Sequence, residues 1–183
     1  IRLFLVLVVT GTMAQAQDVD INIISQLNGS NNGVWPQDAT TATILITVCN
    51  NDGGSTSVPQ YKLRPLLSVP SSIVQIAPDA QQTGLPAGWT ILSNDGASIR
   101  LSNGTDSWPP GECRDIVIKI LPIAQGGPGT FTATMAFSTG VAPGSASGPQ
   151  TVGNNPANDN STTTAIVTAA AALPLKLISF SAI

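Results

Sequence analysis

Apolar and polar residues alternate along most of this chain, and that two-residue period constrains the fold more than any other feature. In the clearest run, residues 130–138, Phe131, Ala133, Met135 and Phe137 fall on one face and threonines on the other. Alternation of this kind is typical of a β-strand with one face in the core. Comparable runs occur at residues 18–23, 41–48, 72–77, 89–93, 98–102, 114–121, 161–169 and 175–183.

Clusters of Gly, Pro, Asn and Asp separate these runs, for example at residues 50–54, 94–96 and 109–111. Such residues favour turns because of their backbone preferences. No window of eleven or more residues shows a helical period. We therefore predict an all-β fold, an antiparallel immunoglobulin-like β-sandwich with an extra C-terminal strand. Residues 139–160, rich in Gly, Pro, Asn and Ser, are expected to form a long loop.

The first residues have the pattern of an export signal. A short apolar run at residues 3–9 follows Arg2, and Ala14-Gln15-Ala16 matches a small-x-small cleavage site. The run is shorter than the roughly 20 residues of a membrane span. We predict cleavage after Ala16, which gives a signal peptide (1–16), a sandwich domain (17–170) and a C-terminal strand or linker (171–183). A retained β-strand at residues 3–9 is the alternative. The predicted location is secreted, at the extracellular cell surface.

The chain has two cysteines, Cys49 and Cys113. In an oxidising compartment an isolated pair normally forms a disulfide. Each cysteine falls on the opposite side of its strand from the Ile/Val stripe, so we predict a bridge between neighbouring antiparallel strands at a sheet end. Two free thiols are the alternative.

The composition disfavours catalysis. The chain has no histidine, ten carboxylates and seven Lys plus Arg, and only 9% of its residues are charged. Histidine is the usual group that titrates near neutral pH in active sites. Nucleic acid binding requires clustered Lys and Arg, and none is present. We predict a protein without enzymatic activity, cofactor or nucleic acid partner.

Calcium is the one metal for which the sequence offers candidate ligands. Ca²⁺ binds six to eight oxygen ligands, often from loops rich in Asp and Asn. Asp52 in one such loop, and Asn154, Asn155 and Asp159 in another, could contribute. The same residues suit turns for backbone reasons alone, and their spacing matches no EF-hand. Turn formation is the favoured interpretation, and no metal site is assigned.

Two Trp-Pro pairs lie in predicted loops, at Trp35 and Trp108. Exposed rings could stack on sugars, which makes a carbohydrate-binding module the alternative function and a polysaccharide a candidate partner. The favoured interpretation is that both rings cap the ends of the core. Trp89, which follows a Pro-Ala-Gly turn, is expected to lie in the core.

Three turn and strand signatures follow in order along the chain: Ile46-Thr47-Val48-Cys49-Asn50, Gly84-Leu85-Pro86-Ala87-Gly88-Trp89 and Pro110-Gly111-Glu112-Cys113. Together they resemble the conserved-repeat immunoglobulin-like domains of bacterial surface proteins, over roughly residues 18–169. The cysteines depart from that pattern. The segment 173–181 is similar to one that joins such domains to C-terminal modules in secreted proteins of Bacteroidetes-type bacteria. The resemblance implies an adhesive or structural role with no catalytic residues.

These features predict a non-catalytic extracellular structural protein, a subunit of a surface fibre or adhesin. Its partners would be copies of itself, joined by β-strand addition, in which a strand of one subunit completes a sheet of the next. The predicted donor strand follows the sandwich, and a linker to a further domain is the alternative for the same segment. Its apolar residues are Leu173, Leu175, Leu177, Ile178 and Phe180.

Overall fold

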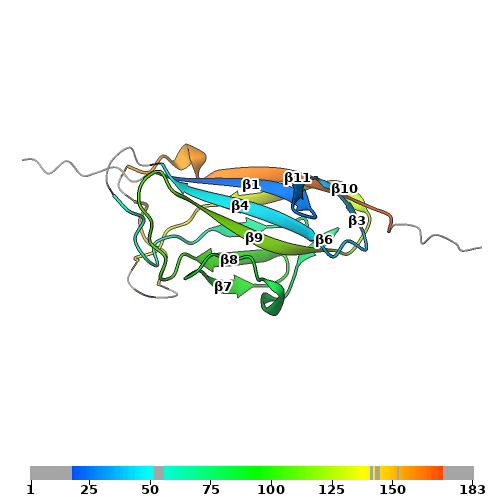
Figure 1. The fold of residues 1–183 in the computed structure, drawn as a ribbon, viewed down its shortest axis with the longest axis horizontal. Coiled ribbons are helices and arrows are strands. Elements are labelled where there is room, and N and C mark those ends of the chain that lie inside the picture. Colours follow the sequence, from blue (N-terminus) through cyan, green and yellow to red (C-terminus); the bar gives the residue numbers. More distant parts are fainter. Residues whose placement is uncertain (1–17, 52–55, 141, 143–144, 152, 171–183) are drawn as a thin grey trace, which may run out of the picture.

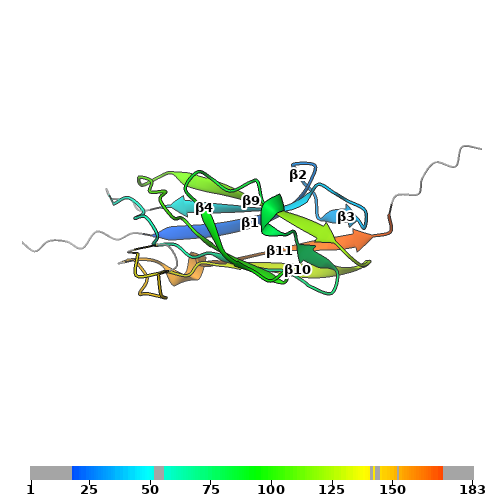
Figure 2. The ribbon, with the colours of Figure 1, turned by 90° about the horizontal axis from the view of Figure 1, so that it is seen from below.

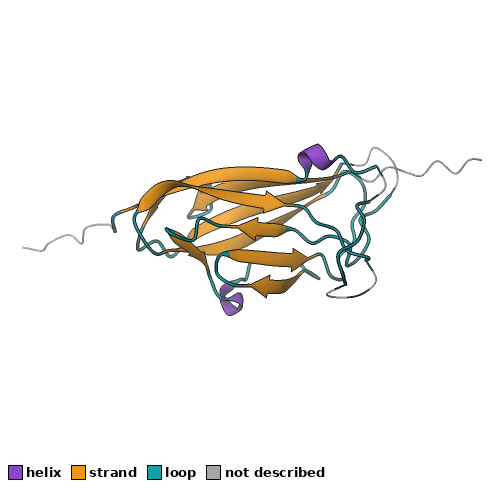
Figure 3. Cartoon of the chain, turned by 180° about the vertical axis from the view of Figure 1, so that it is seen from behind, coloured by secondary structure: helices purple, strands orange, loops and turns teal. Residues whose placement is uncertain are grey.

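The computed structural model describes residues 18–51, 56–140, 142, 145–151 and 153–170 of the chain. These residues form two β-sheets packed face to face, with two single-turn 3₁₀ helices, η1 (Asp79–Gln81) and η2 (Pro156–Asn158) (Figures 1 and 3). The prediction of an all-β sandwich is confirmed. The expected signal peptide and C-terminal strand lie outside the described residues.

One sheet has five strands. In spatial order they are β2 (Ser30–Asn31), β1 (Val19–Leu27), β4 (Ala42–Asn50), β9 (Cys113–Pro122) and β6 (Val74–Ile76). All neighbours in this sheet are antiparallel.

The other sheet has six strands. In spatial order they are β3 (Val34–Pro36), β11 (Asn160–Thr168), β10 (Gly126–Thr134), β5 (Leu66–Ser68), β8 (Ser98–Ser102) and β7 (Thr90–Asn94). β3 and β11 are parallel, and the other pairs are antiparallel. β1 and β11 run in the same direction along the sandwich, so β1 begins at one end and β11 finishes at the other (Figure 2).

The core lies between the sheets and is built by the alternation seen in the sequence. Ile44, Ile46 and Val48 of β4 are fully buried, as are Ile116, Ile118 and Ile120 of β9. Each such side chain stabilises the fold by about 1.5–3 kcal/mol when it leaves water. The predicted inward faces of residues 18–23 and 130–138 are also buried.

Several strand boundaries differ from the prediction. β1 continues to Leu27 although Ser25 faces inward, because the Ser25 hydroxyl donates to the backbone carbonyl of Thr164 at 3.0 Å. β10 begins at Gly126, four residues earlier than expected, through an irregular, glycine-rich pairing with β11. The short strands β2, β3 and β5 were not predicted, because two or three residues give too little alternation to recognise.

Candidate interaction surface

The outer face of the six-stranded sheet is uncharged where β10 and β11 meet. Thr130 lies opposite Thr164 in the ladder, and Thr132 lies opposite Thr162. Thr130, Thr162 and Thr164 are exposed to solvent. Hydroxyl groups rather than charges therefore cover this part of the sheet.

The same face becomes apolar toward the end of β11. Val34 of β3 and Ile166 of β11 are ladder partners, and their side chains are 48% and 41% exposed. Their chain neighbours Trp35 and Val167 point into the core and are 0% and 2% exposed. Val34 and Ile166 thus lie side by side on the outside of the sheet.

Glycines of the adjacent strand leave Ile166 uncovered. β10 passes β11 here as Gly126-Gly127-Pro128-Gly129, so no long side chain extends over the neighbouring strand. Gly127 has a positive φ of 118°, and a Cβ at this position would lie 2.8 Å from the carbonyl oxygen of Ala165. The close approach of the two backbones therefore requires glycine and exposes the isoleucine.

A third apolar side chain belongs to the same end of the sandwich. Ile123, in the turn between β9 and β10, is 39% exposed, and its carbonyl oxygen accepts a hydrogen bond from the Gln37 side chain at 3.0 Å. Gln37 directly follows β3, and its backbone N–H donates to the carbonyl of Thr168 at the end of β11. Val34, Ile123 and Ile166 are the large apolar side chains that the described part of the chain exposes most; we call them the apolar patch.

The patch adjoins an edge of the six-stranded sheet. β3 is the outermost strand beyond β11, and it has three residues. No strand of the described residues pairs with its outer side. Most backbone groups on this outer side are already used: the Val34 N–H donates to Oδ1 of Asn32 at 2.9 Å, Pro36 has no N–H, and its carbonyl accepts from the N–H of Ala39 at 2.9 Å. The Val34 carbonyl is the outward group through which another chain could pair with this edge. β11 leaves the sandwich at this end (Figure 1), and the predicted donor strand, with Leu173, Leu175, Leu177, Ile178 and Phe180, follows it outside the described residues.

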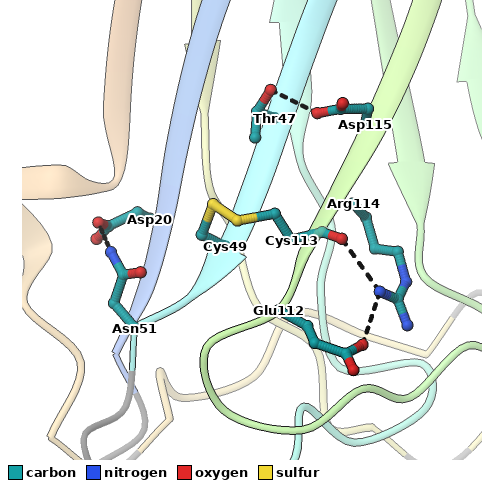
Figure 4. Close-up of a disulfide and its surroundings, with 8 residues drawn as sticks. All are labelled: Asp20, Thr47, Cys49, Asn51, Glu112, Cys113, Arg114 and Asp115. Atoms are coloured by element: carbon teal, nitrogen blue, oxygen red, sulfur yellow. Dashed lines mark hydrogen bonds and ion pairs between the residues drawn. A yellow bond between two sulfur atoms is a disulfide. The ribbon is translucent and has the colours of Figure 1, made fainter.

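The two cysteines form the predicted disulfide at the opposite end. Cys49 and Cys113 are ladder partners of the antiparallel strands β4 and β9, with their Cα atoms 4.0 Å apart. The bridge lies on the outer face of the five-stranded sheet, beside the Thr47–Asp115 hydrogen bond of 2.7 Å (Figure 4). The prediction of a cross-strand bridge at a sheet end, off the buried stripe, is confirmed.

The tryptophans named as candidate sugar ligands are core residues. Trp35 and Trp108 are both 0% exposed, so neither ring offers a face to a ligand. Trp35 packs edge-on against Phe131 with ring centroids 5.5 Å apart. Trp108 lies 6.0 Å from the ring of Trp89, which is itself buried as expected. The assignment of Trp35 and Trp108 as sugar-stacking side chains is therefore wrong, and their burial agrees with the capping interpretation.

The Asp106–Arg114 ion pair, which was not predicted from the sequence, contacts both Trp89 and Trp108. The Asp106 carboxylate accepts hydrogen bonds from the Trp89 indole and from the Arg114 guanidinium, both at 2.9 Å. Arg114 in turn lies 4.9 Å from the centre of the Trp108 ring, a cation–π distance. The bonds to Asp106 and Glu112 raise the pKa of Arg114 and outweigh its partial burial. Asp106 lies in a turn, and no local pattern distinguishes it from a solvated carboxylate.

Comparisons with known proteins give a fold likeness and no family. No family model matches the chain, and no curated protein matches it. Among solved structures, it is similar to a cohesin module of a Clostridium perfringens family 33 glycoside hydrolase, with 10% identity and a TM-score of 0.49. The match covers 82% of this chain and 98% of that chain. An uncharacterised protein from Nocardia farcinica with an immunoglobulin-like fold shares 19% identity with a TM-score of 0.38, covering 80% of this chain and 99% of that chain.

A type I cohesin from Pseudobacteroides cellulosolvens shares 13% identity with a TM-score of 0.38, covering 87% of this chain and 98% of that chain. Likenesses at this level carry no argument about activity or partner. Within the described residues, no helix is long and apolar enough to cross a membrane. The evidence for the interaction surface is therefore the geometry of this chain alone.

Proposed function

We propose that this chain is a non-catalytic extracellular structural module that associates with copies of itself by β-strand addition. Segment 171–183 of one subunit would lie along the outer side of β3 in the next, where the Val34 carbonyl can accept a backbone hydrogen bond and side-chain contacts supply the rest. Its alternating Leu173, Leu175 and Leu177 would cover Val34 and Ile166. Repeated head to tail, such a contact does not close on itself and builds a fibre.

The single observation that carries the proposal is the position of the apolar patch. Val34 and Ile166 are 48% and 41% exposed and are ladder partners at the edge of the six-stranded sheet, and Ile123, 39% exposed, lies in a turn at the same end of the sandwich, where β11 leaves. Scattered exposed apolar residues are ordinary on protein surfaces, but apolar residues gathered at one place mark interaction sites. The uncharged threonine face next to the patch would not repel a second copy of the chain.

The disulfide supports the extracellular part of the proposal. Bridges persist in oxidising compartments and are rare in the cytosol. Cys49 and Cys113 bond directly across two central strands. The apolar run and small-x-small site at the N-terminus independently indicate export.

Removal of segment 171–183 tests the proposal. Residues 17–183 and 17–170 are purified in parallel, and their masses are measured by size-exclusion chromatography with light scattering over a hundredfold range of concentration. We expect the longer chain to form multimers and the shorter one to be a monomer, because the donor strand is missing. Near-ultraviolet circular dichroism of the three tryptophans checks that both chains fold.

Adding the missing segment as a separate peptide is the matched control. A peptide of residues 171–183 should bind to chain 17–170, and a peptide of the same composition in scrambled order should not. Multimers that persist in chain 17–170 would contradict the proposal. A longer chain that stays monomeric at all concentrations would contradict it as well and would favour a linker role for the segment.

A further inference from the structure

A cluster of carboxylates and amides lies at the end of the sandwich opposite the apolar patch. Asp18 and Asp20 stand at the start of β1, and Asn158 and Asp159 end the turn around η2, just before β11. Figure 1 shows η2 beside the beginning of β1. We call these four residues the acidic corner.

The carboxylates of Asp18 and Asp20 both contact the side-chain nitrogen of Asn158. The side-chain nitrogen of Asn158 lies 3.2 Å from each carboxylate oxygen of Asp18, and it also donates to Oδ1 of Asp20. An amide group has two N–H donors, so it cannot satisfy three carboxylate oxygens at once. A cation placed at the position of this nitrogen would have three carboxylate oxygens as neighbours.

The charge of the corner has no cationic partner among the described residues. Arg114 forms ion pairs with Asp106 and Glu112 and not with the residues of the corner. Burial and the neighbouring carboxylates raise the pKa of Asp20 and of Asp159.

Two buried oxygens of the corner lack hydrogen bonds. Asp159 is 4% exposed, and its Oδ1 has no partner, although Oδ2 accepts from Asn154 and Gln150. The side-chain oxygen of Asn158 is likewise buried without a partner. Unpaired buried acceptors are rare and costly, and they point to a missing donor or cation. Oxygens of this kind are what a hard cation prefers.

Among the described residues, no group of three or more Asp, Glu, His or Cys side chains is arranged to hold a metal ion. A site at the corner would therefore be mixed, with carboxylate and amide ligands. The nitrogen and oxygen of an Asn side chain are exchanged by a half-turn of the amide. With a cation bound between Asp18 and Asp20, Asn158 turned in this way would direct its oxygen toward the ion, and its N–H groups would take the place of the buried oxygen.

We propose that the acidic corner binds one calcium ion through Asp18, Asp20 and the side-chain oxygen of Asn158, with Asp159 adding negative charge beside it. Water would complete the six to eight oxygen ligands of Ca²⁺. Mg²⁺ is a poorer fit, because it demands near-ideal octahedral geometry and gives up its water reluctantly. The ion would link the start of β1 to the turn before β11. The proposal does not depend on self-association.

Calorimetric titration of the full chain tests the site. The protein is freed of metal with a chelator and titrated with CaCl₂, and its melting temperature is measured in Ca²⁺, in Mg²⁺ and in NaCl of equal ionic strength. We expect one Ca²⁺ per chain with a Kd of about 0.1–1 mM, the range of extracellular modules. The melting temperature should rise by about 5–10 °C at a hundredfold excess over Kd, and only with Ca²⁺.

Variants separate a specific site from general charge screening. Asp18→Asn and Asp20→Asn should each weaken Ca²⁺ binding at least about tenfold, since each removes a charged ligand. Asp115→Asn is the matched control, because Asp115 bonds to Thr47 on the same sheet away from the corner. It should bind Ca²⁺ as the unaltered chain does.

We expect Asn158→Asp to have opposite effects in the absence and in the presence of Ca²⁺. Without Ca²⁺ it adds a fourth carboxylate to Asp18, Asp20 and Asp159 and should lower the melting temperature, while with Ca²⁺ it should bind the ion more tightly. An amide with a purely structural role would lower the melting temperature in both. The proposal is overturned if the unaltered chain shows no saturable binding up to about 10 mM Ca²⁺. It is also overturned if Asp115→Asn weakens binding as much as Asp18→Asn.

Discussion

Replacing both cysteines with alanine is expected to lower the free energy of unfolding by about 4 kcal/mol. Cys49 and Cys113 are 64 residues apart, so the bridge closes a long loop in the unfolded chain. Within the entropic account of disulfide stabilisation, a loop of this length restricts the unfolded ensemble strongly. Urea denaturation of Cys49→Ala/Cys113→Ala, followed by tryptophan fluorescence, measures the loss.

A neighbouring pair on the same two strands provides the control. Thr47 and Asp115 are the next ladder partners on the same outer face, joined by a hydrogen bond of 2.7 Å (Figure 4). Thr47→Ala/Asp115→Ala should cost about 1 kcal/mol or less, the usual range of a cross-strand polar pair. A cysteine variant that loses no more than this control would contradict a stabilising role for the bridge.

Placing a lysine in the apolar patch is expected to weaken self-association at least about a hundredfold. Val34→Lys or Ile166→Lys removes a contact worth about 2 kcal/mol and brings a charge into the interface, while each factor of ten corresponds to about 1.4 kcal/mol. Both positions are more than two-fifths exposed, so the fold should tolerate the change. Sedimentation equilibrium of the full chain gives the dissociation constants.

A lysine elsewhere on the same strand distinguishes the patch from the sheet face as a whole. Thr162 is exposed on the outer side of β11, on the same face as Ile166. Thr162→Lys adds the same charge away from the patch and should leave the dissociation constant within about threefold of the original, because charges far from a contact are screened by salt. Equal weakening by Thr162→Lys would mean that net charge, not the patch, governs association.

The sequence was most informative where alternation was long. In β4 and β9 the inward and outward faces followed directly from the period, and the disulfide followed from two cysteines on the outward side. The strands β2, β3 and β5 could not be predicted, because they are defined by their tertiary partners and not by a local pattern.

The candidate surfaces required the structure for a similar reason. Val34 and Ile166 are 132 positions apart along the chain, and only the parallel pairing of β3 with β11 brings them together. Asp18 and Asn158 likewise meet through the register of the fold. Asn154, Asn155 and Asp159 were recognised in the sequence as oxygen-rich, but their partners on β1 could not be inferred from local composition. The resemblance to conserved-repeat domains stays a prediction, because no family model matches the chain.

The most direct test of the central claim is a cross-link between subunits. One preparation carries Val34→Cys and a second carries Leu175→Cys, and the two are mixed and gently oxidised, with Thr162→Cys in place of Val34→Cys as the control. Mass spectrometry then identifies which chains are joined. Strand addition predicts a dominant mixed dimer of the Val34→Cys and Leu175→Cys chains and little product with Thr162→Cys. Multimers that form without a mixed Val34–Leu175 cross-link would contradict it, because subunits would then associate through another surface.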